Sequence, residues 1–283
     1  CGEFLSGEAV QDLQNLGLNL DQLGAVTLKE VRLVKDQKLV SSPLPFEAKS
    51  LSRHVLDEAL LKFAFAEGAE IKRGITADRL SQQADGLWCI HGKEFEARAH
   101  SLFLATGKHD IRHWKRPQGV KNDYIGFKMH YRLTDKQAEL LAGHTDIILF
   151  KGGYAGMQPI EAGKANLCLV IEKQRFSWFN KDWHTFLQDL LQHTPYLAGI
   201  LQAAEPLWQK PLAIYGIPYG YVCDSKENEV KNFYRLGDQQ AVIPSFAGGG
   251  MAIALHTAKL AIHHYLTTGC RSYNVAARQQ LKT

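Results

Sequence analysis

The stretch RLGDQQAVIPSFAGGGMAIALHTAKLA (235–261) carries the strongest structural signal in the chain. An apolar strand ends in Gly237-Asp238, and a loop with Gly248, Gly249 and Gly250 opens a helix expected over 251–265. A helix N-terminus offers free N–H groups and a positive dipole to an anion, and glycines let that anion approach the backbone. A carboxylate at the strand end suits the hydroxyl groups of a polyol beside a pyrophosphate. The spacing fits neither GxGxxG nor GxxxxGK[ST], so a plain strand–helix turn with a helix-capping glycine is the alternative.

Composition places the surrounding chain among ordinary globular proteins. Its 283 residues are 45% hydrophobic and 22% charged, which excludes a disordered chain and a coiled coil. Length allows one large domain or two coupled ones. No apolar stretch approaches the roughly 18 residues of a transmembrane helix. The net charge of +4 is spread along the chain, so no nucleic-acid surface is expected. The basic stretch KHDIRHWKR (108–116) is interpreted as a solvated loop, with a weak anion-binding edge as the alternative.

The cysteines indicate neither a disulfide framework nor a metal centre. There are five, widely and irregularly spaced, and none forms a zinc-binding pattern. Cys89 and Cys168 lie in apolar runs and are expected to be buried thiols. The chain starts without a basic and then apolar signal segment, so a cytoplasmic location is expected. Cys1 in first position leaves an N-terminal-cysteine hydrolase as a minor alternative.

Hydrophobic periodicity predicts a mixed α/β (α+β) fold. Helices are expected over 7–17 and 52–69, and residues 70–105 alternate like a β-meander. Strands are expected over 125–133, 146–150 and 164–173, with a turn-rich segment over 153–163. Strand-then-helix elements at both ends enclose this mostly antiparallel middle, which indicates two interleaved subdomains.

Three weaker signals bear on a ligand. The stretch LFLATGKHD (102–110) ends a strand with small residues that a flat ring could lie against, although a simple turn is the preferred interpretation. Arg53 at a helix start faces the unfavourable end of the dipole, which suggests an anionic partner; a surface ion pair with Asp57 is the alternative. Aromatic and proline residues gather at 153–159, 215–221 and 243–246, as either an apolar cleft or ordinary core.

Taken together, these segments resemble the FAD-dependent oxidoreductases that include geranylgeranyl reductases, aromatic hydroxylases and flavin-dependent halogenases. The 235–258 stretch resembles their C-terminal flavin-binding motif. CGEFLS (1–6) looks like the segment after their first βαβ unit, and LSRHVLDEALLKFAFAEGAEI (51–71) like their next helix. ATG (105–107) and GGYAGMQPIEAGKANLCLVI (152–171) resemble further family segments, in family order.

The resemblance implies a Rossmann-like FAD-binding domain over 1–121 and 224–283, incomplete at its N-terminus. A mostly antiparallel β-sheet domain for the substrate, over 122–223, is inserted in it. The implied cofactor-binding residues run along the chain: Cys1, Gly2, Arg53, Thr106, Gly107, Gly237, Asp238, Gly248, Gly249, Gly250 and Met251. The implied substrate-binding residues are Tyr154, Pro159, Pro218, Tyr219 and Phe246.

The sequence departs from the family at two places. The N-terminal GxGxxG unit is absent from the given sequence, so a complementing N-terminal segment is expected as a partner. Gly249 stands where the family often has an acidic residue, and Tyr154-Ala-Gly-Met-Gln-Pro159 lacks the reductases' aromatic pair.

The functional expectation is an FAD-dependent oxidoreductase, of monooxygenase, hydroxylase or reductase type, with NAD(P)H as a candidate electron donor. Its substrate would be a small or medium apolar or aromatic compound. No side chain stands out as a catalytic acid or base. The alternative from another class is a non-catalytic ligand-binding flavoprotein relic that does not hold FAD.

Overall fold

The computed structural model describes residues 2–116, 123–223 and 230–281 and divides into two compact units. Unit 1 comprises residues 1–63, 121–217 and 245–249, and unit 2 comprises residues 64–120, 218–244 and 250–283. Because each unit is assembled from three separate stretches, the chain passes repeatedly between them. The subdomains are therefore interleaved, although the domain boundaries implied by the resemblance stay a prediction.

Unit 1 is built on one nine-stranded sheet with the order β1-β3-β2-β9-β10-β11-β8-β12, in which β13 also pairs with β8. All neighbouring strands are antiparallel except β2 and β9, which are parallel. The strands are β1 (Phe4–Leu5), β2 (Val26–Lys35), β3 (Lys38–Ser50), β8 (Tyr124–Arg132), β9 (His144–Phe150), β10 (Gly153–Ile160), β11 (Lys164–Glu172), β12 (Glu205–Pro206) and β13 (Leu212–Tyr215).

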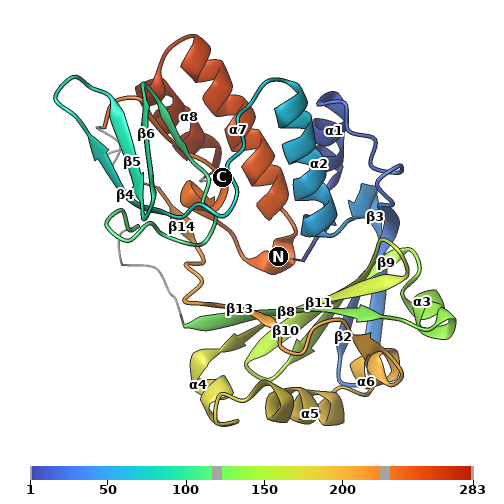
Figure 1. The fold of residues 1–283 in the computed structure, drawn as a ribbon. Coiled ribbons are helices and arrows are strands. Elements are labelled where there is room, and N and C mark those ends of the chain that lie inside the picture. The colour runs from blue at the N-terminus through green and yellow to red at the C-terminus, as the bar shows by residue number, and fades with distance from the viewer. Residues whose placement is uncertain (1, 117–122, 224–229, 282–283) are drawn as a thin grey trace. The chain divides into compact units, whose positions relative to one another are not determined.

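Six α-helices begin in unit 1. They are α1 (Gly7–Asn15), α2 (Arg53–Ala66), α3 (Asp135–Leu141), α4 (Lys173–Ser177), α5 (Trp183–His193) and α6 (Pro195–Leu201). Helices α4, α5 and α6 lie on one face of the sheet (Figure 1). Pro195 lies at the start of α6, where its missing N–H costs nothing, and α5 ends before it.

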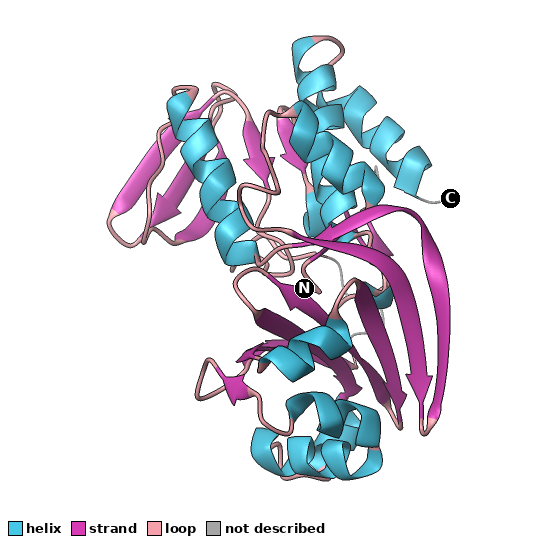
Figure 2. Ribbon diagram, turned by 90° about the vertical axis from the view of Figure 1, so that its right-hand side faces the viewer, coloured by secondary structure: helices cyan, strands magenta, loops and turns pink. Residues whose placement is uncertain are grey.

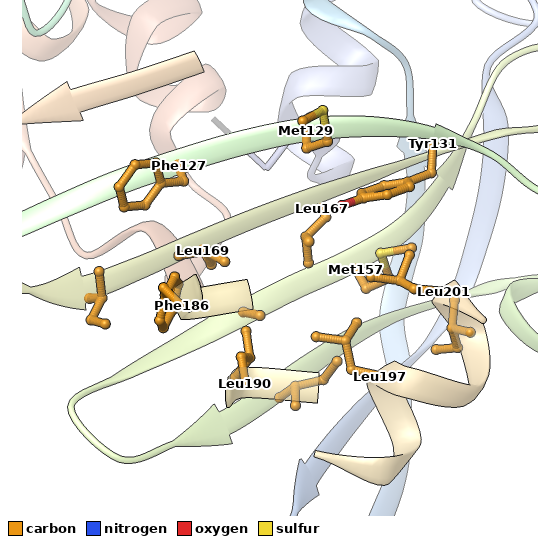
Figure 3. Close-up of a cluster of buried hydrophobic side chains, with 14 of the residues drawn as sticks. Phe127, Met129, Tyr131, Met157, Leu167, Leu169, Phe186, Leu190, Leu197 and Leu201 are labelled. Atoms are coloured by element: carbon orange, nitrogen blue, oxygen red, sulfur yellow. The ribbon is translucent and has the colours of Figure 1, made fainter. Parts of the chain in front are cut away.

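The core of unit 1 lies between the sheet and helices α5 and α6. Alternate residues of β8, β11 and β10 point to this face because side chains alternate along a strand. They meet residues spaced four apart on the helices, as Figure 3 shows. The labelled members are Phe127, Met129, Tyr131, Met157, Leu167, Leu169, Phe186, Leu190, Leu197 and Leu201. The opposite face of the same strands carries polar residues and holds the candidate site.

One expectation about this sheet is wrong. Residues 153–160 form strand β10 instead of a turn-rich segment, paired with β9 and β11 on its two sides. A Cβ on Gly153 would lie 2.1 Å from the Val170 carbonyl oxygen, so the glycine reflects close strand packing. Pro159 lies beyond Met157, the last β10 residue paired with β9, where its missing N–H is tolerated.

The described residues of unit 2 form three small sheets. The meander β4 (Ala77–Gln82), β5 (Trp88–Gly92) and β6 (Phe95–Ala99) is antiparallel, and β14 (Tyr221–Val222) pairs with β16 (Ala241–Val242). Strands β7 (Leu102–Leu104) and β15 (Phe233–Arg235) form a parallel pair. The predicted meander over 70–105 is confirmed for residues 77–99 only. Residues 70–74 are not a strand, and Leu102–Leu104 forms β7, which pairs with β15 instead of β6.

The glycine loop opens a helix, as the sequence predicts. Single-turn 3₁₀ helices at Gly237–Gln239 and Ser245–Ala247 precede α7 (Gly250–Leu266), and α8 (Cys270–Leu281) follows. Figure 2 shows helices in cyan and strands in magenta, and the mixed α/β class with a large, mostly antiparallel sheet is confirmed. Within the described ranges, every helix is too short or too polar to cross a membrane.

Candidate functional site

The candidate residues of unit 1 gather around the Gly2–Phe4 segment. Asn166 on β11 donates its amide N–H to the Gly2 carbonyl oxygen at 2.9 Å. The Arg53 backbone N–H at the start of α2 donates to the Glu3 carboxylate at 2.8 Å. Phe4 packs so closely on Gly248 that a Cβ there would lie 2.9 Å from its ring. Three predicted cofactor positions, Gly2, Arg53 and Gly248, are thus joined through one short segment.

Glu3 is the electrostatic centre of this arrangement, and the sequence reasoning missed it. Its carboxylate is fully buried and has a His130 ring nitrogen at 2.8 Å, while the Lys128 ammonium donates to its other oxygen. Burial alone would raise the pKa of Glu3. The hydrogen bond from His130 and the charge of Lys128 outweigh burial, so the pKa lies below its usual value. Glu3 is therefore a buried anion with charged and polar donors around it.

The polar face of the sheet brings Tyr154 into the same unit. In the unbroken register of β10 and β11, Tyr154 alternates with the core residues Ala155 and Met157. It therefore lies on the face that also carries Asn166 and, on β8, His130. Pro159 has the alternation of the core residues, so its ring lies on the opposite face. The side chains of Tyr154 and Pro159, the two predicted substrate-binding residues of β10, therefore lie on opposite faces of the sheet.

The glycine loop contributes an aromatic residue to unit 1. Phe246 is 58% exposed and meets the Tyr154 ring edge to face, with ring centres 5.8 Å apart. Gly248 has a φ of +71°, a conformation that L side chains rarely adopt. This backbone and the Phe4 contact together explain why glycine is needed at that position.

In unit 2, the ends of the parallel strands β7 and β15 come together. The Lys108 ammonium pairs with the Asp238 carboxylate at 2.9 Å. Gln239 donates to the Gly107 carbonyl oxygen at 2.8 Å. Thr106 is held by a hydrogen bond of 2.7 Å to the His109 carbonyl oxygen. Parallel strands gather ligands at their carboxyl ends, so this cluster lies where the fold class places binding sites.

Arg116 forms several hydrogen bonds with the same cluster. Its guanidinium donates to the Asp110 carboxylate at 2.7 Å and to the carbonyl oxygens of Asp238 and Lys108. It lies over the Tyr221 ring and is only 8% exposed. The interpretation of 108–116 as a solvated loop is therefore wrong for Lys108 and Arg116, because both pair with groups at the strand ends. Arg112, His113 and Lys115 of the same loop are exposed.

Helix α7 is fixed to the end of β15. The Gly237 N–H donates to the Thr257 hydroxyl at 2.9 Å, and that hydroxyl donates to the Ile253 carbonyl oxygen. A Cβ on Gly237 would lie 3.3 Å from the Ala254 side chain. Gly250 and Met251 begin this helix. The close approach of Gly237 to α7 thus depends on glycine and on buried Thr257, a second residue that sequence reasoning missed.

Arg235 stands out because its side chain is buried and forms no ion pair with any residue that the structure describes. Its side chain is 4% exposed, and its Nε and Nη1 atoms make no hydrogen bond. Its only charge-stabilising contact within the described chain is the Phe233 ring, 5.2 Å away. A cation–π contact contributes about 0.5 to 2 kcal/mol. Burying an unpaired charge costs several kcal/mol, so the ring does not compensate.

The remaining predicted residues lie at separate places in the structure. The Arg53 guanidinium forms an ion pair with Asp57 at 2.8 Å, which is the alternative that the sequence analysis gave to an anionic ligand. The Arg53 backbone N–H donates a hydrogen bond to Glu3. Pro218 and Tyr219 lie in the turn before β14 in unit 2. Gly249 lies between Gly248 and Gly250, the first residue of α7. Cys1 lies outside the described residues. Cys89 and Cys168 are buried, as predicted.

Comparisons with known proteins bear on the fold. No protein-family model matches the chain, and no curated protein matches it either. Solved structures do match. The flavin-dependent brominase Bmp2 matches with a TM-score of 0.75 and 18% identity, over 99% of this chain and 73% of its own.

Two further solved structures also match this chain over 99% of its length. One is pqsL, a probable FAD-dependent monooxygenase from Pseudomonas aeruginosa, with a TM-score of 0.72 and 15% identity over 99% of this chain and 81% of its own. The other is a mutant of halogenase PltM in complex with FAD, with a TM-score of 0.73 and 12% identity over 99% and 65%. The chain thus has the α/β fold of flavin-dependent halogenases and FAD-dependent monooxygenases, as the resemblance predicts.

Proposed function

We propose that the protein is an FAD-dependent oxidoreductase acting on a small or medium apolar or aromatic compound. The observation that carries this proposal is a fold shared over 99% of the chain with flavin-dependent enzymes. The clusters around Gly2–Phe4 and around Asp238 support it, because each contains several of the residues that the resemblance assigns to the cofactor.

Within each unit, the glycine backbone of these segments leaves room for part of a cofactor. A Cβ added to Gly2, Gly107 or Gly250 would meet no atom within 4 Å, so each leaves open space beside the main chain. A ring or a phosphate chain can lie against such backbone without steric conflict. The start of α7, a 17-residue helix, adds unsatisfied N–H groups for an anion.

The roles of the residues follow from their chemistry. Asp238 and Gly237 would hold ribityl or pyrophosphate oxygens, with the Lys108 ammonium orienting the carboxylate. The loop from Gly248 to Met251 would line the cofactor, and Thr106 and Gly107 its adenosine end. Gly2, held by Asn166, would support the flavin ring. The flavin, when bound, supplies the redox chemistry, and the protein positions it and excludes water.

Tyr154 and Phe246 are the proposed substrate contacts with the best geometric support. Their edge-to-face pair offers an apolar surface on the polar side of the sheet, next to the loop that would line the cofactor. Lys128 and His130 lie on this same face and are held by Glu3. A substrate with an aromatic body and one polar group suits such a surface, and NAD(P)H is the proposed electron donor.

A complementing segment is part of the proposal. Strand β7 pairs with β15 along one edge, and within the described residues no strand pairs with its other edge. A free edge of a parallel pair can accept a further strand. A βαβ unit carrying GxGxxG would supply that strand together with a helix N-terminus for the pyrophosphate.

The test is the visible absorption spectrum of the purified protein, before and after addition of FAD and removal of the excess. Flavin bands that remain with the protein are the expected result, followed by oxygen consumption on addition of NAD(P)H. The measurement is repeated with a βαβ segment containing GxGxxG added or fused upstream. A cooperatively folded protein that stays colourless in both forms would instead indicate a ligand-binding relic that does not hold FAD.

A further inference from the structure

The buried guanidinium of Arg235 shares its surroundings with a second unpaired donor. The indole N–H of Trp114 is also buried and makes no hydrogen bond. Both side chains lie against the ring of Phe233. The Arg235 guanidinium is 5.2 Å from its centre, and the Trp114 ring centre is also 5.2 Å from it. Two buried side chains with unsatisfied donor atoms thus contact the same ring.

The face of the sheet explains this convergence. In the parallel register, Arg235 is opposite Leu104 and Phe233 is opposite Leu102, so these side chains share one face. Tyr234 lies on the other face, where it stacks on Phe103. On the face with Arg235, the Phe233 ring packs against the buried Trp88 ring and against Trp114, and neither indole side chain offers a hydrogen-bond acceptor.

The carboxylates at the ends of these strands have partners already. Asp110 accepts from Arg116, and Asp238 accepts from Lys108. Neither has an ion pair with Arg235. An arginine presents a planar fork of donors that matches the oxygen atoms of a carboxylate or a phosphate. The Trp114 N–H can add a donor to such a group but cannot accept from it.

We propose that Arg235 and Trp114 form a binding site for the oxyanion group of a small molecule, a phosphate or a carboxylate. The bound group accepts from the guanidinium and from the indole N–H, and the rings of Phe233 and Trp114 flank it. The site belongs to unit 2 alone and does not depend on flavin binding.

The test uses the flavin-free full chain in HEPES buffer at constant ionic strength, set with sodium chloride. Inorganic phosphate and acetate are titrated separately while the melting temperature is followed. One of the two anions is expected to raise the melting temperature by several degrees at millimolar concentration. A response to phosphate alone identifies a phosphate-bearing ligand, and a response to acetate alone identifies a carboxylate. No response to either anion overturns the proposal.

Variants locate the response. Arg235→Met should abolish the stabilisation by the anion. Trp114→Phe keeps an aromatic ring and removes the N–H, and it should weaken anion binding at least threefold. Arg112→Met is the matched control, because Arg112 is an exposed arginine of the same loop as Trp114, and it should respond as the wild type does. An unchanged response in Arg235→Met would contradict the proposal.

The sign of the stability change in anion-free buffer gives a second test. Because Arg235 forms no ion pair in the described part of the chain, Arg235→Met should melt at the same temperature as the wild type or at a higher one. A large decrease would show that the guanidinium has a partner within the protein, which would also overturn the proposal. If Arg235→Met does not fold, Trp114→Phe and Arg235→Lys still report on the donor set.

Discussion

The two units differ in the hydrogen-bond partners that surround a buried charge. In unit 1, the Glu3 carboxylate is completely buried and is met by His130, Lys128 and the Arg53 backbone N–H. In unit 2, the Arg235 guanidinium is almost as deeply buried, and two of its nitrogen atoms have no hydrogen bond. Both residues lie next to segments that the sequence associates with a cofactor.

This difference distinguishes the charge of Glu3, which has a structural role, from the charge of Arg235, which we propose binds a ligand. A buried ion with donors on each side stabilises its surroundings by joining them, as Glu3 joins the chain start, β8 and α2. A buried ion without a partner costs free energy in the folded state, and only a bound counter-ion can recover that cost. Removing each charge should therefore change stability in opposite directions.

The largest expected effect is on Glu3. Glu3→Ala leaves Lys128 and His130 without their shared partner, and breaking a buried pair in this way costs about 3 to 5 kcal/mol. The measurement is the free energy of unfolding in urea. Because folding lowers the pKa of Glu3, its contribution is present at neutral pH and is lost as the pH falls through the folded-state pKa.

Glu8→Ala is the control for that change, because Glu8 is an exposed acidic residue in the first turn of α1. It should cost less than about 1 kcal/mol. A Glu3 variant no less stable than this control would remove the contrast between the two units.

The next effect is on flavin retention. Asp238→Ala should weaken FAD binding by about 100-fold, since it removes a charged acceptor and leaves Lys108 unpaired. The measurement is fluorescence titration of FAD. Asp78→Ala, an exposed aspartate in β4, should bind as the wild type does. Equal affinity of the Asp238 and Asp78 variants would remove Asp238 from the proposed site.

The glycine loop gives an intermediate effect. Gly248→Ala forces a side chain into a positive-φ position and against the Phe4 ring, and should cost about 2 to 3 kcal/mol. Gly269→Ala has a φ of +82° and open space around the added Cβ, so it isolates the backbone strain, about 1 kcal/mol. Thermal unfolding of both variants measures the difference. Equal losses would show that Phe4 does not fix the loop.

The smallest effect distinguishes the two roles open to Arg53. The exposed pair with Asp57 is worth less than about 0.5 kcal/mol, so Arg53→Gln and Asp57→Asn should both unfold almost as the wild type does. If Arg53 also faces a phosphate, only Arg53→Gln weakens FAD binding. Matching FAD affinities in the two variants would restrict Arg53 to the ion pair and to its backbone contact with Glu3.

Local patterns identified much of the fold because they depend on neighbouring residues. The strand ending in Gly237-Asp238, the helix after the glycine loop and the antiparallel middle follow from alternation, helical spacing and glycine placement. The segment 153–163 was misjudged because its glycines and proline are typical of turns, whereas strand pairing on both sides makes it part of the sheet.

The sequence by itself determined the mixed α/β class, the likeness to flavin enzymes and the position of the glycine loop, since all of these are written in contiguous stretches. Only the tertiary structure joined Glu3 to Lys128 and His130, more than 120 residues away, and Lys108 to Asp238, 130 residues away. It alone shows that Arg235 is buried and that its Nε and Nη1 atoms have no hydrogen-bond partner among the described residues. The physical reason is that burial and pairing of a charge depend on which distant segments surround it, and no local pattern specifies those neighbours.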